Sequence, residues 1–353
     1  MKKTISIIAA TAAAVGLISG CASSSSADSK ELTKVRLNEV VHSVFYAPQY
    51  VAMANGYFEE EGLEIELSVG QGADKSMTAL LSDSADIALL GTEAGIYIIN
   101  EGKEGHIKTF AQLTQRAGNF LVSRNEEPDF EWSDLKGKSV IGGRLGGMPE
   151  LVLEYVLKEK GLEIGNDVEI INNISFESTS GAFAADVGDY TVEFEPTATS
   201  LEQKGIGHVV ASLGTESGFI PYTVYMATSD YINNNPETVQ KFTNAIYKGQ
   251  LWVSEHSSKE IAELIQPYFS ENDVETLTGI VERYKAQDTW KSDPVYSEES
   301  LELFEDIMEE GGELSKRVDF DTFIDNSFAQ NAVAEVKYQK TRILNPGFFI
   351  DFK

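Results

Sequence analysis

Short apolar runs alternate with stretches of helical spacing from Val35 onward. Strands are predicted at 35–40, 64–69 and 85–90, and helices at 46–55, 74–82 and 93–100. Later apolar runs predict strands at 107–113, 120–123, 139–142, 168–171, 190–194 and 222–227, and helices at 149–160 and 198–204. The C-terminal third has helical spacing from about Pro236. This alternation is typical of helices packed on mostly parallel sheets and predicts an α/β fold.

The order of the elements predicts two lobes. The chain builds lobe one over residues 34–120, builds lobe two over 121–222, and re-enters lobe one over 223–345. Ligands of open α/β sheets bind at the carboxyl ends of the strands. We therefore predict a two-lobed fold of mixed, mostly parallel sheets with two hinge strands and a binding cleft between the lobes.

The N-terminus has the pattern of an export signal. Lys2 and Lys3 precede an apolar run over 5–18, which is too short to span a bilayer as a stable helix. Cys21 follows small residues and precedes a serine-rich polar stretch. We predict a signal peptide over 1–20, a lipidated Cys21 with a tether over 21–33, and an extracytoplasmic protein anchored to the outer face of the bacterial cell membrane. The alternative is a chance cysteine after an ordinary secretory signal.

The amino-acid composition limits which kinds of site and partner this chain can have. Cys21 is the only cysteine in 353 residues, so a disulfide framework and a thiolate site are excluded. Loss of the signal peptide leaves 26 basic and 56 acidic side chains and a formal charge of −30. Nucleic acid and anionic lipid surfaces would repel such a chain. We expect no nucleic-acid partner.

The histidines and possible nucleophiles show no catalytic or metal-binding pattern. The histidines are His42, His106, His208 and His256, and no two are closely spaced. A metal site therefore has no support in the sequence, and no nucleophile is paired with a base. We predict a protein that is not an enzyme and that carries no cofactor.

Three motifs carry a resemblance to a known family. They are Tyr46-Ala47-Pro48-Gln49-Tyr50-Val51-Ala52, the Asn55-Gly56-Tyr57-Phe58 segment that runs to Ile65, and Ser84-Ala85-Asp86-Ile87-Ala88, with weaker similarity at 134–140 and 193–196. In these segments the chain resembles the solute-binding proteins of ABC importers for nitrate, alkanesulfonates, taurine and thiamine pyrimidine precursors, over roughly residues 34–260. The resemblance implies a type II periplasmic-binding protein, a monomer whose lobes close on a small-molecule solute. It also implies a permease and an ATPase as partners, and it does not fix the solute.

The loop after the first predicted strand offers four candidate ligand-binding residues. Ser43 and the following helix N-terminus would donate hydrogen bonds, and Phe45 or Tyr46 would offer a flat apolar surface. His42 is a further candidate. The alternative interpretation places Phe45 and Tyr46 in the core.

The next two loops each precede a predicted helix. Gln71 is a candidate ligand residue, whereas Asp74 is explained as the N-cap of its helix. Thr92, followed by Glu93, joins a strand to a helix and would present a hydroxyl and backbone N–H groups to a solute.

Further candidates lie near the first crossing and in lobe two. Arg116 would clamp an acidic ligand or form a hinge salt bridge. The glycine-rich turn over 142–149 lacks the order of a phosphate-binding loop, so Met148 is expected as an apolar contact. Ser180 offers a hydroxyl at another predicted helix start.

Glu193 and Glu195 are placed near the second hinge. Buried carboxylates favour a ligand with N–H donors or positive charge and disfavour a free anion, although either side chain could point to solvent. The sequence thus favours the solute-binding component of an importer, with a nitrogen heterocycle or amine as ligand rather than a sulfonate or nitrate. The alternative is a lipoprotein sensor or adhesin that uses the same fold without an importer.

Overall fold

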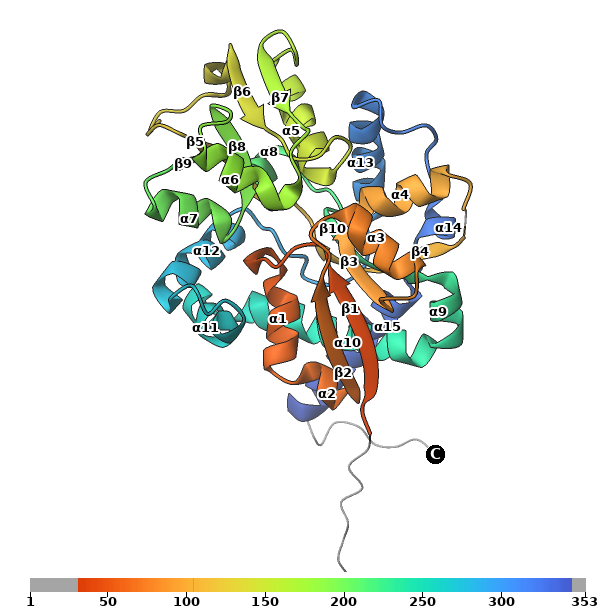
Figure 1. Cartoon of the computed structure of the whole chain (residues 1–353). Helices are drawn as coiled ribbons and strands as arrows, with labels where there is room; N and C mark the ends of the chain where they lie inside the picture. Colours follow the sequence, from red (N-terminus) through yellow and green to blue (C-terminus); the bar gives the residue numbers. More distant parts are fainter. Residues whose placement is uncertain (1–30, 104, 345–353) are drawn as a thin grey trace, which may run out of the picture. The chain divides into compact units, whose positions relative to one another are not determined.

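The computed structural model describes residues 31–103 and 105–344, with side chains up to Val336. The predicted signal peptide, Cys21 and residues 22–30 of the tether lie outside the described residues. From Leu32 onward the described chain forms one compact unit, in which strands and helices alternate (Figure 1).

The first sheet has the strand order β2-β1-β3-β10-β4. Its strands are β1 (Thr33–Glu39), β2 (Leu63–Val69), β3 (Ile87–Gly91), β4 (Ile107–Thr114) and β10 (Thr223–Thr228). β1 pairs in parallel with β2 and β3, whereas β10 is antiparallel to both of its neighbours. The helical elements that connect these strands are η1 (Val44–Tyr46), α1 (Ala47–Ala54), α2 (Tyr57–Glu60), α3 (Ala73–Leu81) and α4 (Thr92–Asn100).

The second sheet has the strand order β7-β6-β8-β5-β9. Its strands are β5 (Asn119–Ser123), β6 (Lys138–Ile141), β7 (Val168–Ile171), β8 (Tyr190–Phe194) and β9 (His208–Ser212). β6 is parallel to β7 and β8, and β5 is antiparallel to β8 and β9. Its helical elements are η2 (Trp132–Leu135), α5 (Met148–Glu159), η3 (Phe176–Ser178), α6 (Thr179–Ala184), α7 (Thr197–Gln203) and α8 (Leu213–Glu216).

The reversed strand in each sheet is the one that arrives from the other sheet. β5 follows β4 out of the first sheet, and β10 follows β9 back into it. The remaining strands of each sheet run in one direction, which confirms the predicted α/β class with mixed, mostly parallel sheets. We call the connections between the sheets, residues 115–118 and 213–222, the crossing segments.

Burial explains the sequence pattern of the strands. β3 lies between β1 and β10 inside the first sheet, every residue in it is buried, and its sequence is an unbroken apolar run ending in glycine. β2 is an edge strand whose residues beyond Leu63 are exposed or half-buried, and its sequence alternates. These two patterns identified both strands from sequence.

The C-terminal third is helical. Its elements are α9 (Ser229–Asn234), α10 (Pro236–Glu255), α11 (Ser258–Ile265), η4 (Gln266–Tyr268), α12 (Val274–Ala286), α13 (Glu298–Glu310), α14 (Phe320–Phe323) and α15 (Ser327–Leu344). α10 packs against α1 and α15 on the first sheet. α13 packs against α5 of the second sheet, and α12 lies near α7, so this region contacts elements of both sheets (Figure 1).

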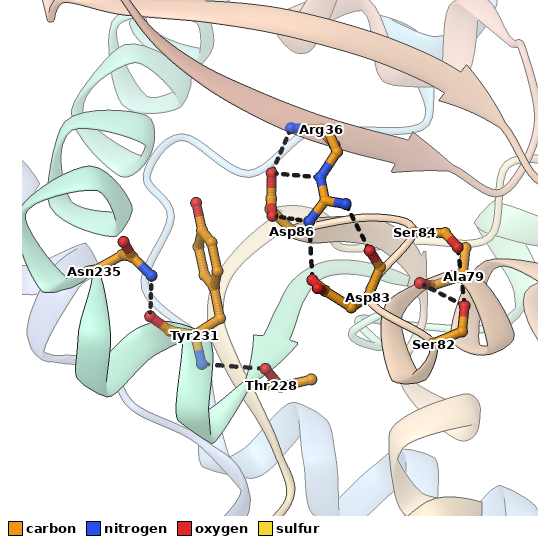
Figure 2. Close-up of polar contacts among 9 residues, drawn as sticks. All are labelled: Arg36, Ala79, Ser82, Asp83, Ser84, Asp86, Thr228, Tyr231 and Asn235. Carbon is orange, nitrogen blue, oxygen red and sulfur yellow. Dashed lines mark hydrogen bonds and ion pairs between the residues drawn. The ribbon is translucent and has the colours of Figure 1, made fainter.

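Asp86, in the third family-like motif, holds the start of β3 against β1. The backbone N–H and Nε of Arg36 donate to Asp86 Oδ2 at 2.8 and 3.1 Å, and Nη2 donates to Oδ1 at 2.6 Å. Arg36 Nη2 also donates to Asp83 Oδ1 at 2.9 Å (Figure 2). This planar pairing of a guanidinium with two carboxylates fixes the loop that leads into the buried strand.

Two details differ from the sequence-based expectations. The N-cap of α3 is Gly72, so the prediction that Asp74 caps this helix is wrong; Asp74 lies inside the first turn. β9 was not predicted, because it is half-buried along its length and lacks a clear alternation. The helix start expected near Ser180 is present as α6.

Candidate functional site

Two adjoining cavities lie between the loops of the two sheets. The first, which we call the Glu93 cavity, has a volume of about 70 Å³. Loops of the first sheet contribute Val40, Val41, Tyr46, Gly72, Ala73, Gly91, Glu93, Tyr222 and Thr223, and the second sheet contributes Arg144, Gly147, Met148, Pro149, Phe176 and Phe194. The cavity therefore lies where the carboxyl ends of strands from both sheets face each other, as expected for a ligand site.

The second cavity, which we call the Glu193 cavity, has a volume of about 290 Å³. It is lined by Val41, His42, Ser43, Gln71, Phe176, Glu177, Thr179, Ser180, Glu193, Phe194, Glu195 and Thr197. Val41, Phe176 and Phe194 line both cavities, so the two form neighbouring parts of one cleft.

Three helices begin at the Glu93 cavity. α3, α4 and α5 have the N-caps Gly72, Gly91 and Gly147, and each of these glycines lines the cavity. In residues 31–103 and 105–344 none of the three N-termini has a side-chain cap. Their first N–H groups and the positive ends of their dipoles are therefore directed at this region.

Glu93 places a carboxyl group among these helix N-termini. The residue is 2 % exposed, and its Oε2 atom has no hydrogen-bond partner among the described residues. Burial raises the pKa of Glu93 to about 7, although nearby backbone N–H groups of Glu93, Met148 and Ala94 and the charge of Arg144 oppose the shift. A Cβ atom on Gly91 would lie 2.0 Å from Glu93 Oε2, so the carboxyl packs directly on the N-cap of its own helix.

Part of the lining of the Glu93 cavity is aromatic. The Phe194 ring lies 5.8 Å from that of Phe176 and 6.1 Å from that of Tyr222, measured between centroids. The Tyr222 hydroxyl is buried and has no hydrogen-bond partner within the part of the chain that the structure describes. Burial, with a smaller effect from Glu93, raises the pKa of Tyr222 well above its usual value. The hydroxyl therefore stays protonated and can donate a hydrogen bond.

Glu193 is the acidic group of the second cavity. It accepts hydrogen bonds from the hydroxyls of Thr191 at 2.9 Å and Thr179 at 3.3 Å. Burial raises the pKa of Glu193 to about 7. Its remaining acceptor capacity lies at the cavity, where a ligand N–H group would satisfy it.

Glu195 also lines this cavity, but its carboxylate is bonded within the protein. Arg283 of α12 donates to Oε1 at 2.7 Å, and the Thr199 backbone N–H and hydroxyl donate to the same carboxylate at 3.0 Å each. Glu195 thus ties α12 to the start of α7.

His42 and Ser43 lie at the Glu193 cavity and have partners in the protein. His42 Nδ1 lies 3.0 Å from Oε1 of the buried Glu39, and His42 Nε2 lies 2.9 Å from the Tyr268 carbonyl. The hydrogen bond to Glu39 raises the pKa of His42. The Ser43 hydroxyl donates to the Glu195 carbonyl at 2.6 Å and so links the two sheets.

Phe45, Thr92 and Arg116 line neither cavity. Phe45 is fully buried among aromatic rings, as the core interpretation expected. The Thr92 hydroxyl donates to the Pro221 carbonyl at 2.5 Å. Arg116 donates to the Gly214 carbonyl at 3.1 Å, and its guanidinium carbon lies 4.1 Å from the centre of the Phe219 ring. Thr92 and Arg116 therefore hold the second crossing segment.

The remaining candidate ligand-binding residues each line one of the two cavities. Tyr46, Glu93 and Met148 line the Glu93 cavity, and Gln71 and Ser180 line the Glu193 cavity.

Sequence reasoning missed Phe176 and Tyr222 as lining residues. Tyr222 had a usable signal, because it opens the predicted strand over 222–227 by which the chain returns to the first sheet. Phe176 lies in the short turn η3 before α6, and this turn was not predicted, so its position carried no signal.

The structure also bears on metal sites and membrane-spanning helices. Within the described ranges no cluster of three or more His, Cys, Asp or Glu side chains has the arrangement of a metal site. Of the helices in the described part, none has the length and apolar content that crossing a membrane requires.

Comparison with known proteins agrees with this geometry. Residues 44–260 match the family described as NMT1/THI5 like. The chain is 45% identical over 304 residues to the protein YtlA of Bacillus subtilis strain 168, covering 86% of this chain and 91% of YtlA. It is 24% identical over 292 residues to the formylaminopyrimidine-binding protein of Halalkalibacterium halodurans, covering 76% and 83% of the two chains.

Solved structures share the fold. The periplasmic nitrate-binding protein NrtA of Synechocystis PCC 6803 superposes with a TM-score of 0.72 at 17% identity, covering 89% of this chain and 91% of NrtA. Two sheets joined by two crossing segments, with a cleft between their loops, give this chain the two-lobed fold of periplasmic-binding proteins. The chain belongs to the NMT1/THI5-like family, and the predicted relationship to the binding proteins of ABC importers is confirmed.

Proposed function

We propose that this protein captures a nitrogen heterocycle or amine outside the cell and delivers it to the permease and ATPase of an ABC importer. The observation that carries the choice of ligand is the buried Glu193 carboxyl, which faces the cleft with two hydroxyls as its hydrogen-bond partners. A desolvated anion beside this group would be repelled, whereas an N–H group would complete its hydrogen bonds. The similarity to a formylaminopyrimidine-binding protein supports the same class of ligand.

The proposal includes the division into lobes. Lobe one would comprise residues 34–120 and 223–345, and lobe two residues 121–222, because β1 to β4 and β10 form one sheet and β5 to β9 the other. Ligand-driven closure would then occur at the crossing segments. A lipid on Cys21 would keep a monomeric protein at the outer face of the membrane beside its permease.

A thermal-shift screen of residues 32–353 tests the proposed ligand class. The panel would contain formylaminopyrimidine, riboflavin, nucleobases and polyamines, and separately taurine, methanesulfonate and nitrate. A ligand at a hundred times its Kd stabilises a fold by about 2.7 kcal/mol, which raises the Tm of a domain of this size by about 4 °C. We expect the shift with a nitrogen compound and its loss in Glu193→Gln. A shift with anions alone would refute the ligand class.

A further inference from the structure

The N-termini of α3, α4 and α5 meet at one cavity, which would by itself attract an anion. The helices have nine, nine and twelve residues, and their N-cap glycines leave the first N–H groups without side-chain caps in the described ranges. Each N-terminus carries a partial positive charge, and three of them act together on the same small volume.

The chain supplies its own carboxyl group at this place. Glu93 begins the first turn of α4, is almost fully buried, and has an Oε2 atom without a partner among the described residues. The position is available to a carboxyl because Gly91 has no side chain, since a Cβ there would fall 2.0 Å from Oε2. Glu93 thus occupies the region in which a bound sulfonate or nitrate would otherwise meet the helix N-termini.

We propose that Glu93 determines the charge preference of the cleft, by excluding anionic solutes from the helix N-termini and accepting an N–H group of the solute at Oε2. This inference rests on the proposed function and assigns its selectivity to one residue. The unpartnered Tyr222 hydroxyl lines the same cavity and donates to an acceptor on the solute. Phe176 and Phe194 add aromatic surface, so the matching chemistry is a flat ring that carries an N–H donor and an acceptor.

The experiment measures gain of anion binding. Glu93→Ser and Glu93→Gln would be compared with the unchanged protein, all as residues 32–353, by calorimetry with nitrate and with methanesulfonate. The matched control is Glu101→Gln, which removes the same charge from the exposed opposite end of α4. We expect no binding by the unchanged protein or the control at about 10 mM anion, and at least about a tenfold gain in affinity in Glu93→Ser. Glu93→Gln keeps the side-chain volume, so it isolates the effect of charge if Glu93→Ser does not fold.

A second pair of probes tests the N–H assignment. 4-Aminopyrimidine carries the donor, and 4-(dimethylamino)pyrimidine lacks it. We expect the unchanged protein to prefer the first compound about tenfold and Glu93→Gln to lose that preference. Equal binding of the two compounds to the unchanged protein would overturn the assignment.

The outcomes separate this inference from the proposed function. Folded Glu93 variants without anion binding, or nitrate binding by the unchanged protein, would overturn the role of Glu93. Failure of every nitrogen compound in the thermal-shift screen would overturn the proposed ligand class, whereas gain of anion binding in Glu93→Ser would still support the exclusion of anions by Glu93.

Discussion

Glu193→Gln is the substitution whose effect on stability follows most directly from the structure. The Glu193 carboxyl is 5 % exposed and accepts hydrogen bonds from two threonine hydroxyls. Burial raises its pKa from 4.5 to about 7 in the folded protein. A glutamine has the same shape and can retain both contacts, so the substitution chiefly removes the ionisation.

The direction in which Glu193 changes protein stability with pH follows from proton binding. Between pH 4.5 and 7 the folded protein holds the Glu193 proton and the unfolded chain has lost it, so this group lowers stability as pH rises. The penalty is absent below the unfolded pKa and complete above the folded one. With 1.36 kcal/mol per pKa unit, it grows by about 2–3 kcal/mol between pH 5 and pH 8. Glu193→Gln should therefore stabilise the ligand-free protein at pH 8 and have little effect at pH 5.

Urea unfolding followed by the fluorescence of the three tryptophans measures this difference. The free energies of unfolding of residues 32–353 and its Glu193→Gln variant would be compared at pH 5, 6, 7 and 8 without ligand. The control is Glu169→Gln, an exposed position on β7 of the same sheet. A difference between Glu193→Gln and the unchanged protein that stays constant from pH 5 to pH 8 would refute the reasoning.

The remaining predictions concern residues that shape the cleft. Gly91→Ala should destabilise the fold by about 1–3 kcal/mol in urea unfolding, because the new methyl displaces the carboxyl packed against it; Gly181→Ala, with open space around its Cβ position, should not. Asp86→Asn should lower the free energy of unfolding by about 1–2 kcal/mol, because its pairing with a guanidinium is weakened. Arg283→Met should lower the free energy of unfolding by about 2 kcal/mol at pH 7, because Glu195 stays buried and loses its charged partner. Unchanged stability would show that the hydrogen bonds from Thr199 are enough to stabilise the buried carboxylate.

Most of the fold could be predicted from sequence because the strands differ in burial. β3 is buried along its whole length and is a short apolar run that ends in glycine. β8 is also buried throughout, although Thr191 and Glu193 lie between its apolar residues. The long amphipathic helices, such as α5, have both the spacing and the length that identify a helix. β9 escaped detection because a half-buried strand has neither an unbroken apolar run nor a strict alternation.

The site could be predicted only in part, because sequence shows where a polar group stands along the chain and not what it bonds to. Ser43 and Thr92 occupy the strand ends that the fold turns toward the cleft, yet both hydroxyls donate to backbone carbonyls of residues far along the chain. Glu195 is paired by an arginine nearly ninety positions away. From sequence, Glu93 was a candidate only because it lies at the start of a predicted helix. Its burial, its unpartnered oxygen and its place among three helix N-termini are known only from the structure.

These bonds divide the polar groups of the cleft into two sets with different tasks. The hydroxyls of Ser43 and Thr92 and the carboxylate of Glu195 join the two sheets or hold a crossing segment, so they set how the lobes meet. The carboxyl of Glu93 and the hydroxyl of Tyr222 have buried atoms free of such bonds among the described residues. A buried polar atom without a partner is costly, so it marks where a ligand would contribute most. We propose that the second set acts with Glu193 in solute selectivity, so its substitution should change what binds while leaving the connection between the lobes in place.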